Sequence, residues 1–185
     1  MKRIMNSNKL IGNTYSLSPL TRDDITKDYI AWLNDPIVNK FLEVKHVNQT
    51  LETVTEYIND FYKDNERYIW GIYSIENKLF IGTVSLTNVN RYHNRANLGI
   101  MIGNSDYWGK SAAEEAYSLV IDFAFNILGL NRVGGGCYST HIGMNFTLKR
   151  LGFTREGVIR KCILEGDKYI DAWRWGILSD EWKSE

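Results

Sequence analysis

Residues 106–125 read DYWGKSAAEEAYSLVIDFAF, and this stretch decides the fold. An aromatic pair and a glycine lead through small residues into an apolar segment, which predicts a buried helix that runs to about Leu128 and stops at Gly129. A helix leaves its first four backbone N–H groups unpaired, and small residues let phosphate oxygens approach them. Gly109–Ala113 therefore suit an anion-binding site, although tight packing of the helix against a strand accounts for the same residues.

The composition of the chain is that of an ordinary globular protein. Its 185 residues are 44% hydrophobic and 24% charged, and 22 Lys and Arg balance 22 Asp and Glu. This length predicts a single domain over residues 1–185, and a neutral chain lacks the basic surface expected of a nucleic-acid partner. Cys137 and Cys162 fall in no CxxC motif or Cys/His cluster, so we expect neither a metal site nor a disulfide framework.

The first twenty residues have a basic start but no sustained apolar stretch, so they do not resemble a signal peptide. No segment approaches the roughly 18 apolar residues of a membrane span. We therefore expect a cytoplasmic protein that contacts no membrane.

The rest of the sequence predicts one α/β domain with a mixed, mostly antiparallel sheet of about seven strands flanked by helices. Alternating segments rich in β-branched and aromatic residues predict the strands, and apolar residues three or four apart predict the helices. One strand–helix–strand crossover lies in the middle of the chain. Strands are expected at 14–19, 67–75, 79–89, 95–102, 132–139, 154–164 and 168–178; besides the helix of the opening stretch, helices are expected after Thr21 and at Asp35-Pro36, 50–62 and 145–151.

Residues 95–153 resemble the core of the GNAT superfamily of acyl-coenzyme A N-acyltransferases. The branch they resemble most contains the ribosomal-protein N-terminal and amino-sugar acetyltransferases. The resemblance implies acetyl-CoA as the cosubstrate, direct transfer of the acetyl group to an amine, and no metal. It covers nearly the whole chain and rests on LGIMI at 98–102, WGKSAAEEA at 108–116, LGF at 151–153, WLNDP at 32–36 and YIDAWRWGIL at 169–178.

The resemblance also implies where acetyl-CoA binds. The backbone of residues 99–102 would pair with the pantetheine arm, and the N–H groups of residues 108–113 would hold the pyrophosphate. Three glycines at 134–136 suit a strand that separates from its neighbour to admit the arm, although they equally suit a bulge or tight packing. The expected cofactor-binding residues are Gly99, Ile100, Met101, Ile102, Trp108, Gly109, Lys110, Ser111, Ala112, Ala113, His141 and Asn145.

The two catalytic residues common in the family are missing from their usual places. Asn97 stands where many members have a glutamate base, and Leu148 stands where many have a tyrosine that protonates the leaving thiolate. N-acylation needs a neutral amine and benefits from a proton donor for the thiolate, so His93, Tyr138 and His141 become the catalytic candidates. A structural role stays open for each of these three: an exposed turn, core packing and helix capping, respectively.

The acceptor is expected to be a primary amine of a small molecule, with a nucleotide-linked amino sugar as one candidate. Two alternatives are a protein N-terminus and a non-catalytic acyl-CoA sensor, the latter suggested by the missing catalytic residues. We expect the protein to be a monomer or a homodimer. From their positions in related folds, the resemblance implies that Trp32, Trp70 and Tyr73 bind the substrate, and that Phe41, Glu43 and His46 are further candidates for the acceptor pocket. Asn97 and Asp171 complete the expected substrate-binding residues.

Overall fold

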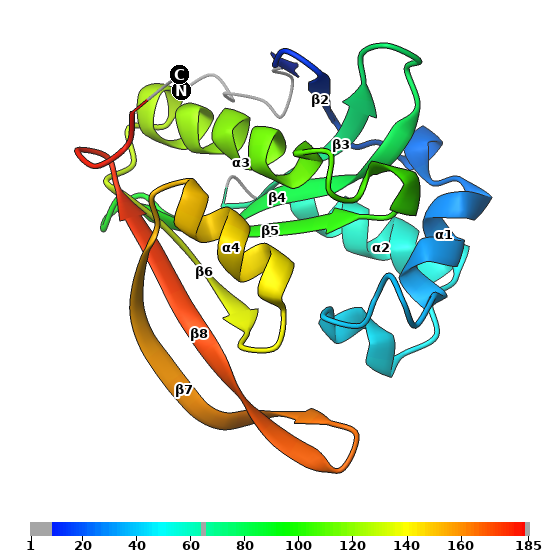
Figure 1. Ribbon diagram of the computed structural model, residues 1–185. Coiled ribbons are helices and arrows are strands. Elements are labelled where there is room, and N and C mark those ends of the chain that lie inside the picture. The colour runs from blue at the N-terminus through cyan, green and yellow to red at the C-terminus, as the bar shows by residue number, and fades with distance from the viewer. Residues whose placement is uncertain (1–8, 64–65, 184–185) are drawn as a thin grey trace.

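The computed structural model describes residues 9–63 and 66–183, so the basic start of the chain lies outside the described residues. Within these ranges, eight strands form one sheet in the order β1-β2-β3-β4-β5-β6-β8-β7 (Figure 1). The predicted mixed α/β sheet is confirmed, with the two-residue β1 as the additional strand. The strands are β1 (Leu10–Ile11), β2 (Tyr15–Pro19), β3 (Tyr68–Ser74), β4 (Phe80–Asn90), β5 (Arg95–Ile102), β6 (Arg132–Tyr138), β7 (Thr154–Glu165) and β8 (Lys168–Leu178).

Helices cover both faces of the sheet (Figure 1). One apolar core packs the α3 and α4 helices against one face, and a second core packs α1 and α2 against the other. The long helices are α1 (Lys27–Asn34), α2 (Leu51–Phe61), α3 (Ala112–Asp122) and α4 (Ile142–Arg150). Shorter helical turns are η1 (Arg22–Asp24), η2 (Glu43–His46), η3 (Ser105–Tyr107) and the π-helical η4 (Phe123–Ile127), which continues α3.

The β5 and β6 strands are parallel, whereas every other neighbouring pair of described strands is antiparallel. Helix α3 connects them, so this is the predicted strand–helix–strand crossover. Their pairing covers only Arg95↔Arg132 to Asn97↔Gly134, and beyond it the strands separate. The separation leaves one side of β5 without a neighbouring strand from Leu98 onward.

The first predicted helix begins later than expected. Thr21 and Asp24 form a capping box where the helix was expected to start, but the turn that they close is the three-residue η1. Helix α1 begins only at Lys27, where the Thr26 hydroxyl accepts a hydrogen bond from the Tyr29 N–H at 3.1 Å. One local capping motif therefore stabilises a short turn, and a second cap starts the helix.

The predicted helix at Asp35-Pro36 is wrong, because this segment is a turn. Asp35 ends α1, and its carboxylate accepts a hydrogen bond from the Ile37 N–H at 2.8 Å. Such a side-chain turn competes with helix formation. The buried Asn39 then donates its amide to the Leu33 carbonyl at 2.8 Å, which fixes the return of the chain toward η2.

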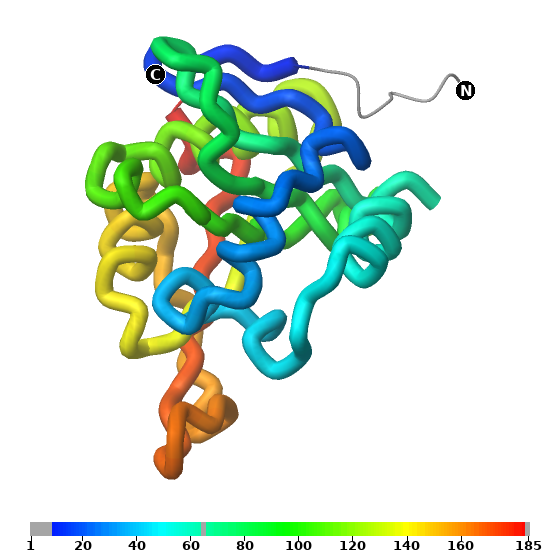
Figure 2. The backbone as a smooth tube through the Cα atoms, turned by 90° about the vertical axis from the view of Figure 1, so that its right-hand side faces the viewer, coloured from blue at the N-terminus to red at the C-terminus, as the bar shows by residue number. Residues whose placement is uncertain are grey.

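The β7 and β8 strands form a long two-stranded ribbon that extends beyond the rest of the molecule, as both views show (Figures 1 and 2). Its register closes at Glu165↔Lys168, and bulges lie between Arg155 and Gly157 and between Ile159 and Ile163. The ribbon places Glu165 near its tip.

Candidate active site

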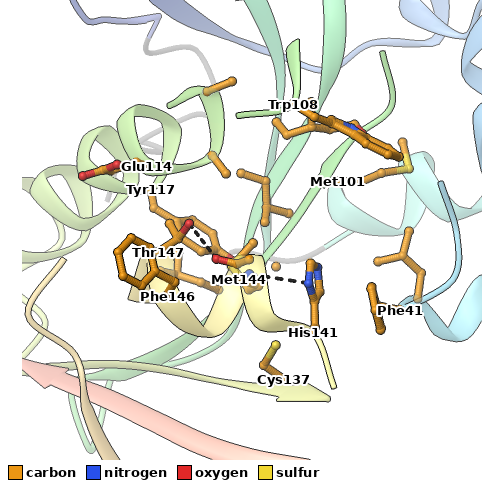
Figure 3. Close-up of a pocket in the computed structure, with 18 of the residues that line it drawn as sticks. Phe41, Met101, Trp108, Glu114, Tyr117, Cys137, His141, Met144, Phe146 and Thr147 are labelled. Atoms are coloured by element: carbon orange, nitrogen blue, oxygen red, sulfur yellow. Dashed lines mark hydrogen bonds between the residues drawn. The ribbon is translucent and has the colours of Figure 1, made fainter. Parts of the chain in front are cut away.

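A cavity of about 750 Å³ lies between the separated ends of β5 and β6 (Figure 3). This volume falls in the range of about 300–1,000 Å³ that is typical of small-molecule sites. Its walls come from β5, β6, the start of α3, one face of α4 and the segment before η2. The lining residues used below are Phe41, Glu43, Leu98–Ile102, Trp108, Gly109, Ser111–Glu114, Tyr117, Gly136–Tyr138, His141, Gly143, Met144, Phe146, Thr147 and Arg150.

The backbone of β5 presents hydrogen-bonding groups to the cavity. The Gly103 N–H donates to the Ile81 carbonyl at 2.9 Å, which makes Gly82↔Ile102 a non-hydrogen-bonded pair of the β4–β5 ladder. In such a ladder alternate residues face away from the partner strand, so Leu98 and Ile100 direct their N–H and C=O groups toward the gap. This edge suits an extended ligand that carries amides.

The predicted strand residues therefore divide into two groups. Ile100 offers its backbone to the cavity, and Ile102 faces the same way, but its carbonyl already accepts the Trp108 indole N–H at 2.8 Å. Gly99 and Met101 line the cavity, although their backbone groups face β4. Leu98 joins Ile100 at the gap, although it was not among the expected cofactor-binding residues. Strand alternation counted from the crossover would have identified it.

The start of α3 forms a further wall. The first helical bond runs from the Glu115 N–H to the Ser111 carbonyl, so the N–H groups of residues 112–114 precede the helical ladder. Gly109 and Ser111 both adopt left-handed backbone angles, with φ of +71° and +57°. Ser111 thus holds the conformation that glycine favours, at a cost of about 1–2 kcal/mol. Lys110 does not line the cavity, because its ammonium lies over the Tyr107 ring, 5.3 Å from the centroid.

Tyr138 reaches the cavity from the end of β6. Its side chain is mostly buried, and its hydroxyl donates to Glu43 Oε1 at 2.9 Å. Burial, followed by the hydrogen bond to Glu43 and its charge, raises the pKa of Tyr138 to about 12. The phenol is therefore protonated at neutral pH and can donate a proton.

His141 caps α4 and lines the cavity as well (Figure 3). Its Nδ1 accepts the Met144 N–H at 3.4 Å, and its ring stacks on Phe41 with 4.0 Å between centroids. Burial, and then the charge of Lys40, lowers the pKa of His141, so the ring is neutral at pH 7. A neutral imidazole that accepts at Nδ1 carries its proton on Nε2, so in this position it donates rather than accepts there.

One face of α4 forms part of the cavity wall with residues that were not among the expected site residues. Gly143, Phe146, Thr147 and Arg150 line the cavity at spacings of three, one and three residues. This is the spacing of a single helix face, so helical periodicity would have identified the set. Arg150 also pairs with Glu114 of α3 at 3.1 Å, which joins the two helices at the cavity.

Buried thiol and phenol groups complete the inner wall. Burial raises the pKa of Cys137 to about 12, so this thiol stays protonated and does not suit a nucleophilic role. Burial also raises the pKa of Tyr117, which projects from α3 (Figure 3).

Two predicted residues lie elsewhere in the structure. His93 is exposed in the turn before β5, at the end of that strand opposite the cavity, and its N–H donates to Asn90 Oδ1 at 2.8 Å. Asn145 is buried and bonded, because its amide donates to the carbonyls of Tyr138 and His141, both at 3.0 Å. Its Oδ1 accepts the Trp175 indole N–H at 3.0 Å, so Asn145 ties α4 to β6 and β8 instead of contacting the cavity.

None of the five predicted substrate-binding residues lines the cavity. Trp70 is 1% exposed and packs between Tyr68 and Phe123 in the core. Trp32 and Tyr73 both pack on Phe80, and the Tyr73 hydroxyl donates to Asp24.

The other two polar candidates are engaged within strands. Asn97 makes the last β5–β6 pair, opposite Gly134. Asp171 accepts the Lys161 N–H at 2.8 Å on the ribbon. Phe41 and Glu43, the further candidates, do line the cavity, whereas His46 does not.

Within residues 9–63 and 66–183, no three His, Cys, Asp or Glu side chains are grouped closely enough to bind a metal ion. Nor does any helix there combine the length and apolar character that crossing a bilayer requires.

Comparison with known proteins places this architecture among acetyltransferases. Residues 16–154 match the family model described as an acetyltransferase (GNAT) domain. The uncharacterized N-acetyltransferase YoaA of Bacillus subtilis (strain 168) is 27% identical over 158 residues, which are 84% of this chain and 88% of that protein.

Two solved structures share the fold. Spermidine N-acetyltransferase from Vibrio cholerae, in complex with CoA and spermine, is 22% identical with a TM-score of 0.82, over 92% of this chain and 98% of that one. Ribosomal-protein-S5-alanine acetyltransferase from Vibrio fischeri is 20% identical with a TM-score of 0.75, over 95% and 99%. Because the neighbours include both kinds of enzyme, the branch within the superfamily stays a prediction.

Proposed function

The chain belongs to the GNAT family of N-acetyltransferases, and we propose that it acetylates a primary amine of a small molecule through the cavity between β5 and β6. GNAT enzymes use acetyl-CoA and acetylate amine acceptors. For this chain the observation that carries the proposal is the open edge of β5 beside the start of α3, since both offer backbone donors to one cavity.

In this proposal the chain binds acetyl-CoA through its backbone. The N–H and C=O groups of Leu98 and Ile100 would pair with the amides of the pantetheine arm. The N–H groups of residues 112–114 would bind the pyrophosphate, supported by the positive end of the α3 dipole. Gly109 and Ser111 keep side chains small where the phosphates would approach.

Tyr138 is the proposed proton donor. The acceptor ammonium first releases a proton to solvent at the open end of the cavity, beside Glu43. The amine nitrogen then forms a bond to the acetyl carbon, the carbon–sulfur bond breaks, and the Tyr138 hydroxyl gives its proton to the sulfur. The nitrogen loses its second proton to solvent and Tyr138 regains one, so the products are an acetamide and free CoA thiol.

The proposed acceptor is a small-molecule amine. A small molecule is favoured because, of the acidic residues described in the front half of the chain, Glu43 alone lines the cavity, which is little for a basic protein tail. A nucleotide-linked amino sugar is one such acceptor. A protein N-terminus and a role as a non-catalytic acyl-CoA sensor are the alternatives.

Calorimetry with acetyl-CoA, using adenosine diphosphate as the control, tests the donor site. We expect micromolar binding of acetyl-CoA and much weaker binding of adenosine diphosphate. Release of CoA thiol is then measured with small amines, a nucleotide-linked amino sugar and an alanine-starting peptide. Turnover of the peptide alone would support the N-terminal acetyltransferase, and binding without any turnover would support the sensor.

A further inference from the structure

The open end of the cavity gathers opposite charges around the Tyr138 ring. Glu43 lines the cavity with its side chain 79% exposed, and one of its oxygens accepts the Tyr138 hydroxyl. The Lys45 ammonium lies over the same ring, 4.8 Å from the centroid, and donates to the Lys40 carbonyl at 2.9 Å. A carboxylate and an aromatic face are the groups that bind an ammonium ion.

Glu165, near the tip of the β7–β8 ribbon, does not line the cavity but contributes negative charge at the Tyr138 ring. Its Oε1 is buried and has no hydrogen-bond partner in the described part of the chain. An unpaired buried carboxylate oxygen is costly, and a cationic donor would satisfy it. The charge of Glu165 also contributes, after burial and Glu43, to the raised pKa of Tyr138, so it acts on the same ring.

We propose that Glu43 selects an acceptor that carries a second positive charge, such as an α,ω-diamine, and that Lys45 occupies the place of that charge when no acceptor is bound. This inference rests on the proposed function, because it concerns the acceptor end of the same cavity. It disfavours nucleotide-linked acceptors, whose phosphates would meet Glu43.

The same arrangement links acceptor binding to catalysis. Besides burial, the hydrogen bond to Glu43 and its negative charge hold the pKa of Tyr138 high, which makes the phenol a weak proton donor. A cation paired with Glu43 offsets that charge and lowers the pKa of Tyr138 toward its usual value. A cationic acceptor should therefore raise kcat as well as lower KM.

The test compares 1,4-diaminobutane with butan-1-amine at saturating acetyl-CoA, with the full chain. The two amines have the same carbon skeleton, so the ratio of their kcat/KM values isolates the second charge. After a twofold correction for its two amines, we expect the diamine to be preferred about tenfold at low salt. Glu43→Gln, which can still accept the Tyr138 hydrogen bond, should bring the ratio close to one.

Two further variants sharpen the test. Glu76→Gln removes the same charge from an exposed residue that does not line the cavity, and it should keep the preference. Lys45→Met removes the competing ammonium, so KM for the diamine should fall severalfold.

Each outcome is decisive. Equal kcat/KM values for the two amines in the wild type, or a preference that survives in Glu43→Gln, would overturn the inference. Turnover of neither amine by a chain that binds acetyl-CoA would overturn the inference and leave the donor site standing. A chain that does not bind acetyl-CoA would refute the proposed function itself.

Discussion

Replacing Gly109 by aspartate adds a negative charge beside the start of α3, and replacing it by asparagine adds nearly the same shape without the charge. A Cβ at this position meets no atom within 4 Å, so both side chains start in open space. The backbone angle φ of +71° imposes strain on both variants, but Asn and Asp tolerate this region better than most residues. The difference between the two variants therefore reports the charge.

The size of the effect follows from the exposure of this loop. Two unit charges 4 Å apart interact by about 1 kcal/mol in water and about 4 kcal/mol at an effective dielectric of 20. Gly109 is exposed, so the value near water applies. A pyrophosphate carries about two negative charges, and a somewhat longer separation leaves roughly 1.4 kcal/mol of repulsion, which is about tenfold in Kd.

Calorimetry with acetyl-CoA measures this difference directly. We expect Gly109→Asp to bind about tenfold more weakly than Gly109→Asn at low ionic strength. The gap should shrink when salt is raised to roughly 0.5 M, because exposed charges are screened. Equal Kd values in two folded variants, shown by matching thermal unfolding, would refute a pyrophosphate site at the start of α3.

Three more outcomes are expected. Tyr138→Phe should lower kcat at least about tenfold with the Kd of acetyl-CoA unchanged, and an unaltered kcat in steady-state assays would exclude Tyr138 as the acid. The lowered pKa of His141 means that the folded state binds fewer protons than the unfolded state, so stability falls as pH drops from 6.5 through the folded pKa. In urea unfolding, His141→Gln should lose less stability than the wild type between pH 7.5 and 5, and an identical loss would contradict the reasoning. Asn145→Ala should lower the free energy of unfolding by about 2–3 kcal/mol, because the Trp175 indole and two carbonyls lose buried partners, and a loss below 1 kcal/mol in the same assay would argue against this tie.

The strands were predictable because each carries its own periodic signal over five or more residues. The seven expected strands all form, each within one residue of its predicted ends. The two-residue β1 gives no such signal, since it exists through pairing with β2. The helix predicted at Asp35-Pro36 is wrong because the short polar side chain of Asp35 can either start a helix or close a turn. Tertiary contacts decide which of the two structures forms.

The residues that line the cavity were predictable where the wall is formed by backbone, and they were not predictable where the prediction required knowing which face of a strand points to the cavity. The start of α3 and the edge of β5 carry local features, namely small residues and a crossover. Trp70 was assigned to the acceptor pocket but faces the core, because helices cover both sides of the sheet and alternation does not say which face holds the cavity. His93 lies in the turn that leads into β5, a strand that lines the cavity, but this turn is at the end of β5 away from the cavity.

The position of Tyr138 follows from the feature that opens the cavity. The place where many family members have their tyrosine is Leu148, which is 6% exposed and packs into the core under α4. The separation of β6 from β5 after Gly134 leaves the end of β6 beside the cavity. A phenol at the last residue of β6 can therefore reach the site without any change in α4. In the proposed mechanism the proton donor therefore lies on a strand instead of the helix while the fold stays the same, and its neighbour, Glu43, would link proton donation to the charge of the acceptor.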